Sequence, residues 1–123
     1  MQTTPRISEA EWEVMRIAWE RGTVTAQAVV DALGHKDWSP RTVKTLLNRL
    51  VKKGALAFQA QGKAYLYRPA VPMEKCVREE SRSFLDRVFG GEAAPALAHF
   101  VKSAKLSPDE IKELKRILAE KSK

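Results

Sequence analysis

The chain has 123 residues, which is room for one compact domain, or for a domain of about 70 residues with a short helical appendage. Its 22 Lys and Arg against 15 Asp and Glu give a formal charge of +7. A single cysteine, Cys76, excludes an intramolecular disulfide framework and fits a reducing compartment. No stretch has the composition of a signal peptide or a membrane span, so the sequence predicts a cytoplasmic protein.

The basic charge is confined to one part of the chain. Residues 36–68 hold eight basic residues and one acid, Asp37, so this segment alone carries an excess equal to that of the whole chain. A charge that serves only solubility need not be segregated in this way. The segment therefore predicts a binding face for a polyanion.

Three helices are predicted before residue 55. Residues 8–21 begin with a capping box formed by Ser8 and Glu11 and carry a wide apolar face. A short strand at residues 23–24 leads to a second helix at residues 26–33, and residues 38–54 form the third. Helices of this length joined by short turns that contain Gly match a helix-turn-helix unit.

The third predicted helix has two contrasting faces. Ser39 can cap it, and Pro40 suits the first helical position. The face that must be buried consists of Val43, Leu46, Leu47 and Leu50. The opposite face holds cations and short hydrogen-bonding side chains, namely Arg41, Thr42, Lys44, Thr45, Asn48, Arg49 and Lys52. A solvated helix face usually mixes both signs of charge, whereas this face has no carboxylate.

A β-hairpin follows the third helix. Residues 56–60 and 64–68 read as strands on either side of a tight polar turn, with Lys63 at the tip. Tyr65 and Tyr67 share one face of the second strand, where packing on the helices is favoured over stacking on bases. Three helices and a basic-tipped hairpin predict a winged helix-turn-helix DNA-binding domain at residues 1–71.

The rest of the chain, residues 72–123, reads as a helical dimerisation domain. Pro69 and Pro72 mark a linker, and three short amphipathic helices then carry more apolar surface than they can hide among themselves. The residues assigned to the dimer contact are Phe84, Leu85, Val88, Leu97, Phe100, Val101, Ile111, Leu114 and Leu118. The alternative is that these helices pack back on the N-terminal domain as one monomeric core. The predicted fold is therefore mainly α with a small β-hairpin.

No catalytic constellation is visible in the sequence. The motifs of serine hydrolases, zinc proteases and phosphate-binding loops are absent, and neither His35 nor His99 has a Cys or His neighbour at ligand spacing. The sequence predicts no enzyme, no cofactor and no metal site.

Binding to double-stranded DNA would give a role to the basic residues of both the third helix and the hairpin. The major groove admits a helix whose N-terminal residues reach base edges, so Arg41, Thr42 and Thr45 are the first candidates for sequence readout. Lys52, Lys53 and Lys63 are assigned to phosphates. The full predicted DNA-binding set is Ser39, Arg41, Thr42, Lys44, Thr45, Asn48, Arg49, Lys52, Lys53 and Lys63. Two alternatives stay open: a winged-helix interaction module that binds an acidic protein or membrane surface without sequence-specific DNA recognition, and a repressor that senses a small molecule.

Three segments of the chain resemble a known family. SEAEWEVMRIAW, KDWSPRTVKTLLNRLVKKG and LSPDEIKELKRIL are similar to signatures of the penicillinase-repressor family, the BlaI/MecI group of winged-helix transcriptional repressors. The resemblance implies a homodimer that represses by occupying a palindromic operator with TACA and TGTA half-sites, and that controls antibiotic resistance genes such as β-lactamase. By position, it assigns to the recognition helix and the wing Ser39, Arg41, Thr42, Thr45, Arg49 and Lys63.

The resemblance also implies a mode of induction. In the best-known members, a membrane sensor protease of the BlaR/MecR type detects a β-lactam, and the repressor is then cleaved at an Asn-Phe bond in its dimerisation domain. The aligned pair here is His99 and Phe100, so the Phe is kept and the Asn is not. A copper-responsive branch has a cysteine-rich C-terminus, whereas this chain ends in LAEKSK, which argues against metal sensing of that kind.

Overall fold

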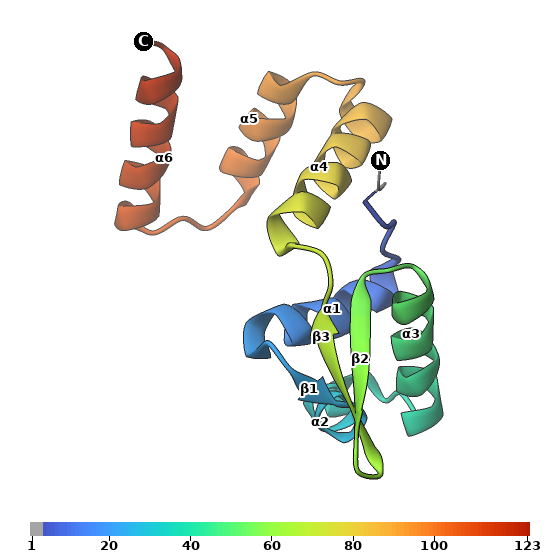
Figure 1. The fold of residues 1–123 in the computed structure, drawn as a ribbon. Helices are drawn as coiled ribbons and strands as arrows, with labels where there is room; N and C mark the ends of the chain where they lie inside the picture. The colour runs from blue at the N-terminus through green and yellow to red at the C-terminus, as the bar shows by residue number, and fades with distance from the viewer. Residues whose placement is uncertain (1–3) are drawn as a thin grey trace. The chain divides into compact units, whose positions relative to one another are not determined.

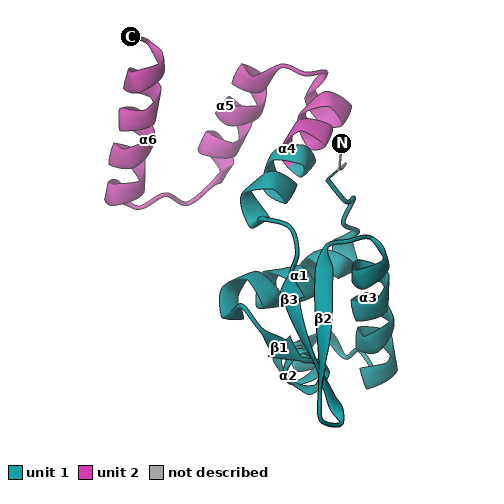
Figure 2. Cartoon of the chain, viewed as in Figure 1, with its two compact units in different colours: residues 1–80 teal, residues 81–123 magenta. Residues whose placement is uncertain are grey.

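The computed structural model describes residues 4–123 of the chain. In chain order (Figure 1) the elements are α1 (Glu9–Arg21), β1 (Val24–Thr25), α2 (Ala26–Ala32), a 3-10 helix η1 (Gly34–Lys36), α3 (Pro40–Lys52), β2 (Leu56–Gln61), β3 (Ala64–Pro69), α4 (Met73–Phe89), α5 (Ala93–Ser103) and α6 (Pro108–Lys121). These elements form two compact units that divide between Glu80 and Ser81, within α4 (Figure 2). Within residues 4–123, no helix is both long enough and apolar enough to cross a membrane.

The first unit combines a helical core with a small antiparallel sheet. Its three strands lie in the order β1-β3-β2, and Tyr67 of β3 pairs with Val24 on one side and with Phe58 on the other. β2 and β3 form the predicted hairpin, which turns at Gly62 and Lys63. Gly62 has a φ of 61°, which a residue without a Cβ adopts at little cost.

Local capping explains where α1, α2 and α3 begin. The side chains of Ser8, Thr25 and Ser39 accept hydrogen bonds from backbone amides of α1, α2 and α3, respectively. The capping box of Ser8 and Glu11 is present as predicted. The η1 turn after α2 is a feature that the sequence prediction lacked.

The core of the first unit is built on the apolar face of α3. Val43, Leu46, Leu47 and Leu50 are each at most 5% exposed, which confirms the face predicted from their spacing. They pack with buried side chains of α1 and α2, including Val14, Met15 and Val29. Burial on this side leaves the opposite side of α3 to solvent.

The segment between β3 and α4 is attached to the first unit. The indole Nε1 of Trp19 donates a hydrogen bond of 2.9 Å to the carbonyl oxygen of Val71. Val71 and Cys76 are both buried in the core of this unit, so the first turn of α4 is part of the same packing. The compact unit therefore extends beyond residue 71, where the sequence placed the domain boundary. The functional division into residues 1–71 and 72–123 stays a prediction.

The second unit contains the end of α4 together with α5 and α6. The rings of Phe84, Phe89 and Phe100 cluster with centroid separations of 6.0–6.3 Å, and Ala96 of α5 is buried. None of the 14 residues of α6 is buried. The three predicted helices are present, but much of their apolar surface has no cover within residues 4–123.

Candidate nucleic-acid interface

The N-terminal end of α3 is fixed by Ser39. Its hydroxyl oxygen accepts a 3.2 Å hydrogen bond from the backbone amide of Thr42 and lies 3.1 Å from the hydroxyl oxygen of Thr42. Pro40 occupies the first helical position, where its missing N–H costs no helical hydrogen bond. Ser39 and Thr42 therefore hold each other in place at the end of the helix that would enter a groove.

The face of α3 that is predicted to bind DNA, here called the reading face, is open to solvent along its whole length. Its seven residues, from Arg41 to Lys52, are all exposed, as is Ser39, and the helix has no acidic residue. The hydroxyl of Thr45 donates a 3.0 Å hydrogen bond to the carbonyl oxygen of Arg41. Its proton is therefore engaged within the helix, which leaves the methyl group and the acceptor lone pairs of Thr45 for an outside partner.

Lys63 is exposed at the hairpin tip, as predicted. Figure 1 shows the β2–β3 turn and the N-terminal end of α3 at the same end of the first unit. The turn that carries Lys63 and the end of α3 that carries the predicted base-reading residues therefore lie at the same end of the first unit.

Lys53 differs from the other predicted phosphate contacts. Its Nζ lies 2.5 Å from Oε1 of Glu11 and 2.9 Å from the carbonyl oxygen of Arg6, to which it donates a hydrogen bond. Glu11 is 1% exposed, so its carboxylate depends on partners within the fold. Lys53 therefore joins the end of α3 to the start of α1, and its ammonium is engaged inside the unit.

The pKa of Glu11 is lowered from its ordinary value of 4.5. Burial by itself raises this pKa, but the hydrogen bond from Lys53, the hydrogen bonds from the amide and hydroxyl of Ser8, and the charge of Lys53 together outweigh burial. The native fold therefore favours the ionised carboxylate.

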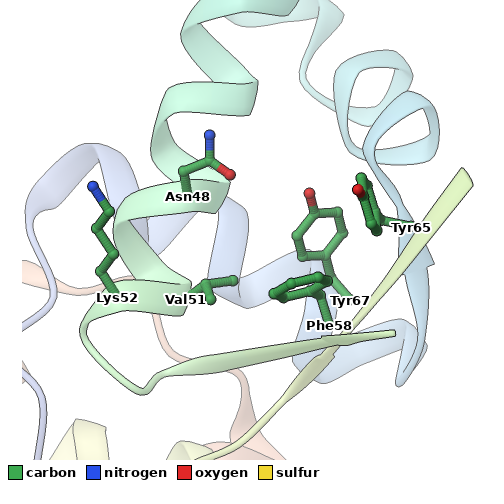
Figure 3. Close-up of a pocket in the computed structure, with 6 residues that line it drawn as sticks. All are labelled: Asn48, Val51, Lys52, Phe58, Tyr65 and Tyr67. Carbon is green, nitrogen blue, oxygen red and sulfur yellow. The ribbon is translucent and has the colours of Figure 1, made fainter. Parts of the chain in front are cut away.

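A cavity of about 300 Å³ lies between α3 and the hairpin (Figure 3). The residues that line it are Asn48, Val51, Lys52, Phe58, Tyr65 and Tyr67. Tyr67 is 8% exposed, as expected for packing on the helices, whereas Tyr65 is 52% exposed and Phe58 53%. The packing predicted for Tyr65 is therefore wrong, since about half of its side chain is open to solvent.

The cysteine and the two histidines, which could in principle take part in catalysis or bind a metal ion, lie in different elements. Cys76 is 3% exposed, and burial raises the pKa of its thiol. His35 belongs to η1 in the first unit and His99 to α5 in the second. Within residues 4–123, no group of three or more His, Cys, Asp or Glu side chains is placed to hold a metal ion.

The order of elements in the first unit defines a winged helix-turn-helix domain, in which α3 has the position of the recognition helix and the β2–β3 hairpin that of the wing. The chain belongs to the penicillinase repressor family, whose sequence model matches residues 7–120. It is 36% identical over 121 residues to the penicillinase repressor of Bacillus licheniformis, covering 98% of this chain and 94% of that protein. It is 37% identical over 119 residues to the methicillin resistance regulatory protein MecI of Staphylococcus aureus strain N315, covering 96% of this chain and 97% of that protein.

A solved relative supports the same assignment for the first unit. The solution structure of monomeric BlaI from Bacillus licheniformis, in complex with the blaP half-operator, matches this chain with a TM-score of 0.53 and 37% sequence identity. The match covers 61% of this chain and 93% of that chain.

Proposed function

We propose that this protein is a transcriptional repressor, not an enzyme, and that it binds a palindromic DNA operator through α3 and the wing. One observation carries this proposal: the exposed face of α3 holds cations and hydroxyls with no acid, in a winged helix that is 37% identical to a repressor solved with half-operator DNA. A helix of this kind fits the major groove, where side chains distinguish base pairs by their donors, acceptors and methyl groups.

The residues of the interface have different roles in this proposal. Arg41, Thr42 and Thr45 read base edges from the N-terminal half of α3, while Lys52 and Lys63 contact phosphates. The remaining members are Ser39, which orders the end of α3, together with Lys44, Asn48 and Arg49, which extend the same face. Lys53 supports the position of α3 through Glu11 instead of touching DNA.

Two variants separate base reading from phosphate contact. Replacing Thr45 with Ala should lower the preference for the operator over a scrambled duplex by roughly tenfold, since a single lost base contact is worth about 1–3 kcal/mol. Replacing Lys63 with Ala should weaken binding to both duplexes alike, and should reduce the slope of log K against log salt by about 0.9. Fluorescence anisotropy titrations at several salt concentrations measure both quantities.

The assignment of the recognition helix is wrong if both variants lose affinity uniformly on all duplexes. If the wild-type protein shows no preference between DNA sequences and heparin displaces its partner, the basic face instead serves an acidic protein or membrane surface, which is the alternative function.

The protein acts as a homodimer in this proposal, and the second unit supplies the contact. The predicted contact residues on α5 and α6 are solvent-exposed, with exposed fractions that include 55% for Leu97, 53% for Val101 and 61% for Leu118. Ile117, which the predicted set omits, is 44% exposed on the same helix as Leu118. Large apolar side chains exposed in this number favour an association site, and a palindromic operator matches a two-fold symmetric dimer.

Repression ends in this proposal when a membrane sensor protease of the BlaR/MecR type cuts between His99 and Phe100. Both residues lie in α5, and Phe100 is 47% exposed. The carbonyl oxygen of His99 accepts a hydrogen bond from the hydroxyl of Ser103. Helix α5 must therefore open locally before the peptide bond between His99 and Phe100 can enter the active site of a protease.

Co-expression with such a sensor and exposure to a β-lactam should give a fragment ending at His99 by mass spectrometry. An intact chain under these conditions contradicts this mode of release.

A further inference from the structure

The proposed function gives no role to the aromatic side of the cavity between α3 and the hairpin. Its aromatic wall is formed by Phe58 and Tyr65, whose ring centroids are 5.3 Å apart in an edge-to-face arrangement, and by Tyr67, 6.4 Å from Phe58. Figure 3 shows the Phe58 ring reaching toward Val51 of α3. Two half-exposed aromatic rings beside a concave surface favour a partner with a flat apolar side.

The cavity continues the proposed reading face of α3. Residues 41, 45, 48 and 52 follow one another at helical spacing, so Asn48 and Lys52 lie on the same side of the helix as Arg41 and Thr45. Asn48 and Lys52 also line the cavity. A DNA duplex placed against the N-terminal half of α3 therefore extends over the cavity toward the hairpin.

The chemistry of the cavity suits an anionic partner. No carboxylate lines it within the described part of the chain, whereas the amide of Asn48, the ammonium of Lys52 and the phenols of Tyr65 and Tyr67 are all hydrogen-bond donors. Burial, and to a smaller extent the electrostatic interaction with Tyr65, raises the pKa of Tyr67, so its hydroxyl keeps its proton at neutral pH. The cavity thus combines apolar rings with neutral and cationic donors.

We propose that this cavity binds the sugar–phosphate backbone of the operator where it passes between the groove read by α3 and the groove reached by the wing. A deoxyribose packs on Phe58, and the adjacent phosphate accepts hydrogen bonds from the hydroxyl of Tyr65 and the amide of Asn48. The inference rests on the proposed function and adds Phe58 and Tyr65 to the interface. Because the backbone is the same for every sequence, these contacts strengthen binding to all duplexes alike.

Tyr65→Phe tests the proposal, because it removes one exposed hydroxyl and keeps the ring. Affinity should fall roughly ten- to a hundredfold on the operator and on a scrambled duplex, as expected for a lost hydrogen bond to a charged group. The slope of log K against log salt should stay unchanged, since an uncharged donor displaces no counterion. In contrast, Lys52→Met should lower the slope by about 0.9. Phe58→Leu should weaken binding to both duplexes as well, through loss of the flat surface.

Gln59→Ala is the matched control. Gln59 is exposed on β2 next to Phe58, and strand alternation places it on the opposite face of the hairpin. Its affinity for both duplexes should equal that of the wild type. Thermal unfolding of all variants checks that the hairpin stays folded.

The outcomes separate this inference from the proposed function. Wild-type protein that fails to bind any duplex overturns both. Wild-type protein that binds DNA while Tyr65→Phe and Phe58→Leu bind with the same affinity overturns the inference alone. A Tyr65→Phe effect confined to the operator also overturns it, because that result assigns Tyr65 to base reading.

Discussion

Replacing Lys53 with Met is expected to lower the free energy of unfolding by about 3 kcal/mol, the lower end of the range for removing one partner of a buried ion pair. The carboxylate of Glu11 is 1% exposed and would lose the ammonium that lies 2.5 Å away. The side chain of Lys53 is 37% exposed, so water can replace part of its contribution, which places the effect at the lower end. Urea unfolding at neutral pH, followed by circular dichroism, measures the change.

Lys52→Met is the control for this experiment. Lys52 is the preceding residue on the same helix and is exposed, so its loss should change the unfolding free energy by less than about 0.5 kcal/mol. Equal stabilities of the two variants would contradict the structural role given to Lys53.

The pH dependence of stability gives a second readout of the same pair. Because the pKa of Glu11 is lower in the folded state than its ordinary value of 4.5, the carboxylate stabilises the fold fully above that value. This contribution is lost as the pH falls through the lowered folded-state pKa. The stability difference between the wild type and Glu11→Gln should therefore be largest near neutral pH and shrink on acidification. A difference that does not change with pH would show that the carboxylate is not preferentially ionised in the native fold.

Replacing Leu118 with Glu is expected to convert a dimer into a monomer and to lower operator affinity by about a hundredfold or more, because two linked half-site contacts become one. Among the large apolar side chains of residues 4–123, Leu118 has the highest exposed fraction, 61%, and it lies on a helix with no buried residue. A charge placed in an apolar contact must lose its hydration for the dimer to form. Analytical ultracentrifugation measures the oligomeric state, and anisotropy titration measures the affinity.

Leu118→Lys separates dimerisation from electrostatics in the same experiment. It adds a positive charge, which by itself would favour DNA, but it should break the dimer and lower operator affinity as Leu118→Glu does. A monomeric wild-type protein, or dimers that survive both substitutions, would contradict the role of α6 and favour a monomeric core.

The parts of the fold that depend on neighbouring residues could be predicted from the sequence. The apolar spacing from Val43 to Leu50, the cap at Ser39 and the turn at Gly62 are local signals, and the structure confirms each of them. The η1 turn was not predictable in this way, since no cap or periodicity marks its three residues.

The features that the sequence could not supply depend on contacts between distant residues. Lys53 reads as one more cation of a basic segment, but its partner Glu11 lies 42 positions away. Pro69 and Pro72 predict a linker, whereas Pro69 belongs to β3 and the hydrogen bond from Trp19 to Val71 ties the segment after it to α1. Tyr65 and Tyr67 share a strand face, yet Tyr67 is 8% exposed and Tyr65 52%, so strand alternation alone does not predict which of the two is covered.

The measurement that tests the central claim most directly is a titration of the wild-type protein against a TACA/TGTA palindrome and a scrambled duplex of equal length, at moderate and at raised salt. Sequence-specific repression predicts a preference for the palindrome of roughly a thousandfold or more, with affinity for both duplexes falling as salt rises. Equal affinity for the two duplexes at both salt concentrations would contradict recognition of that operator by α3.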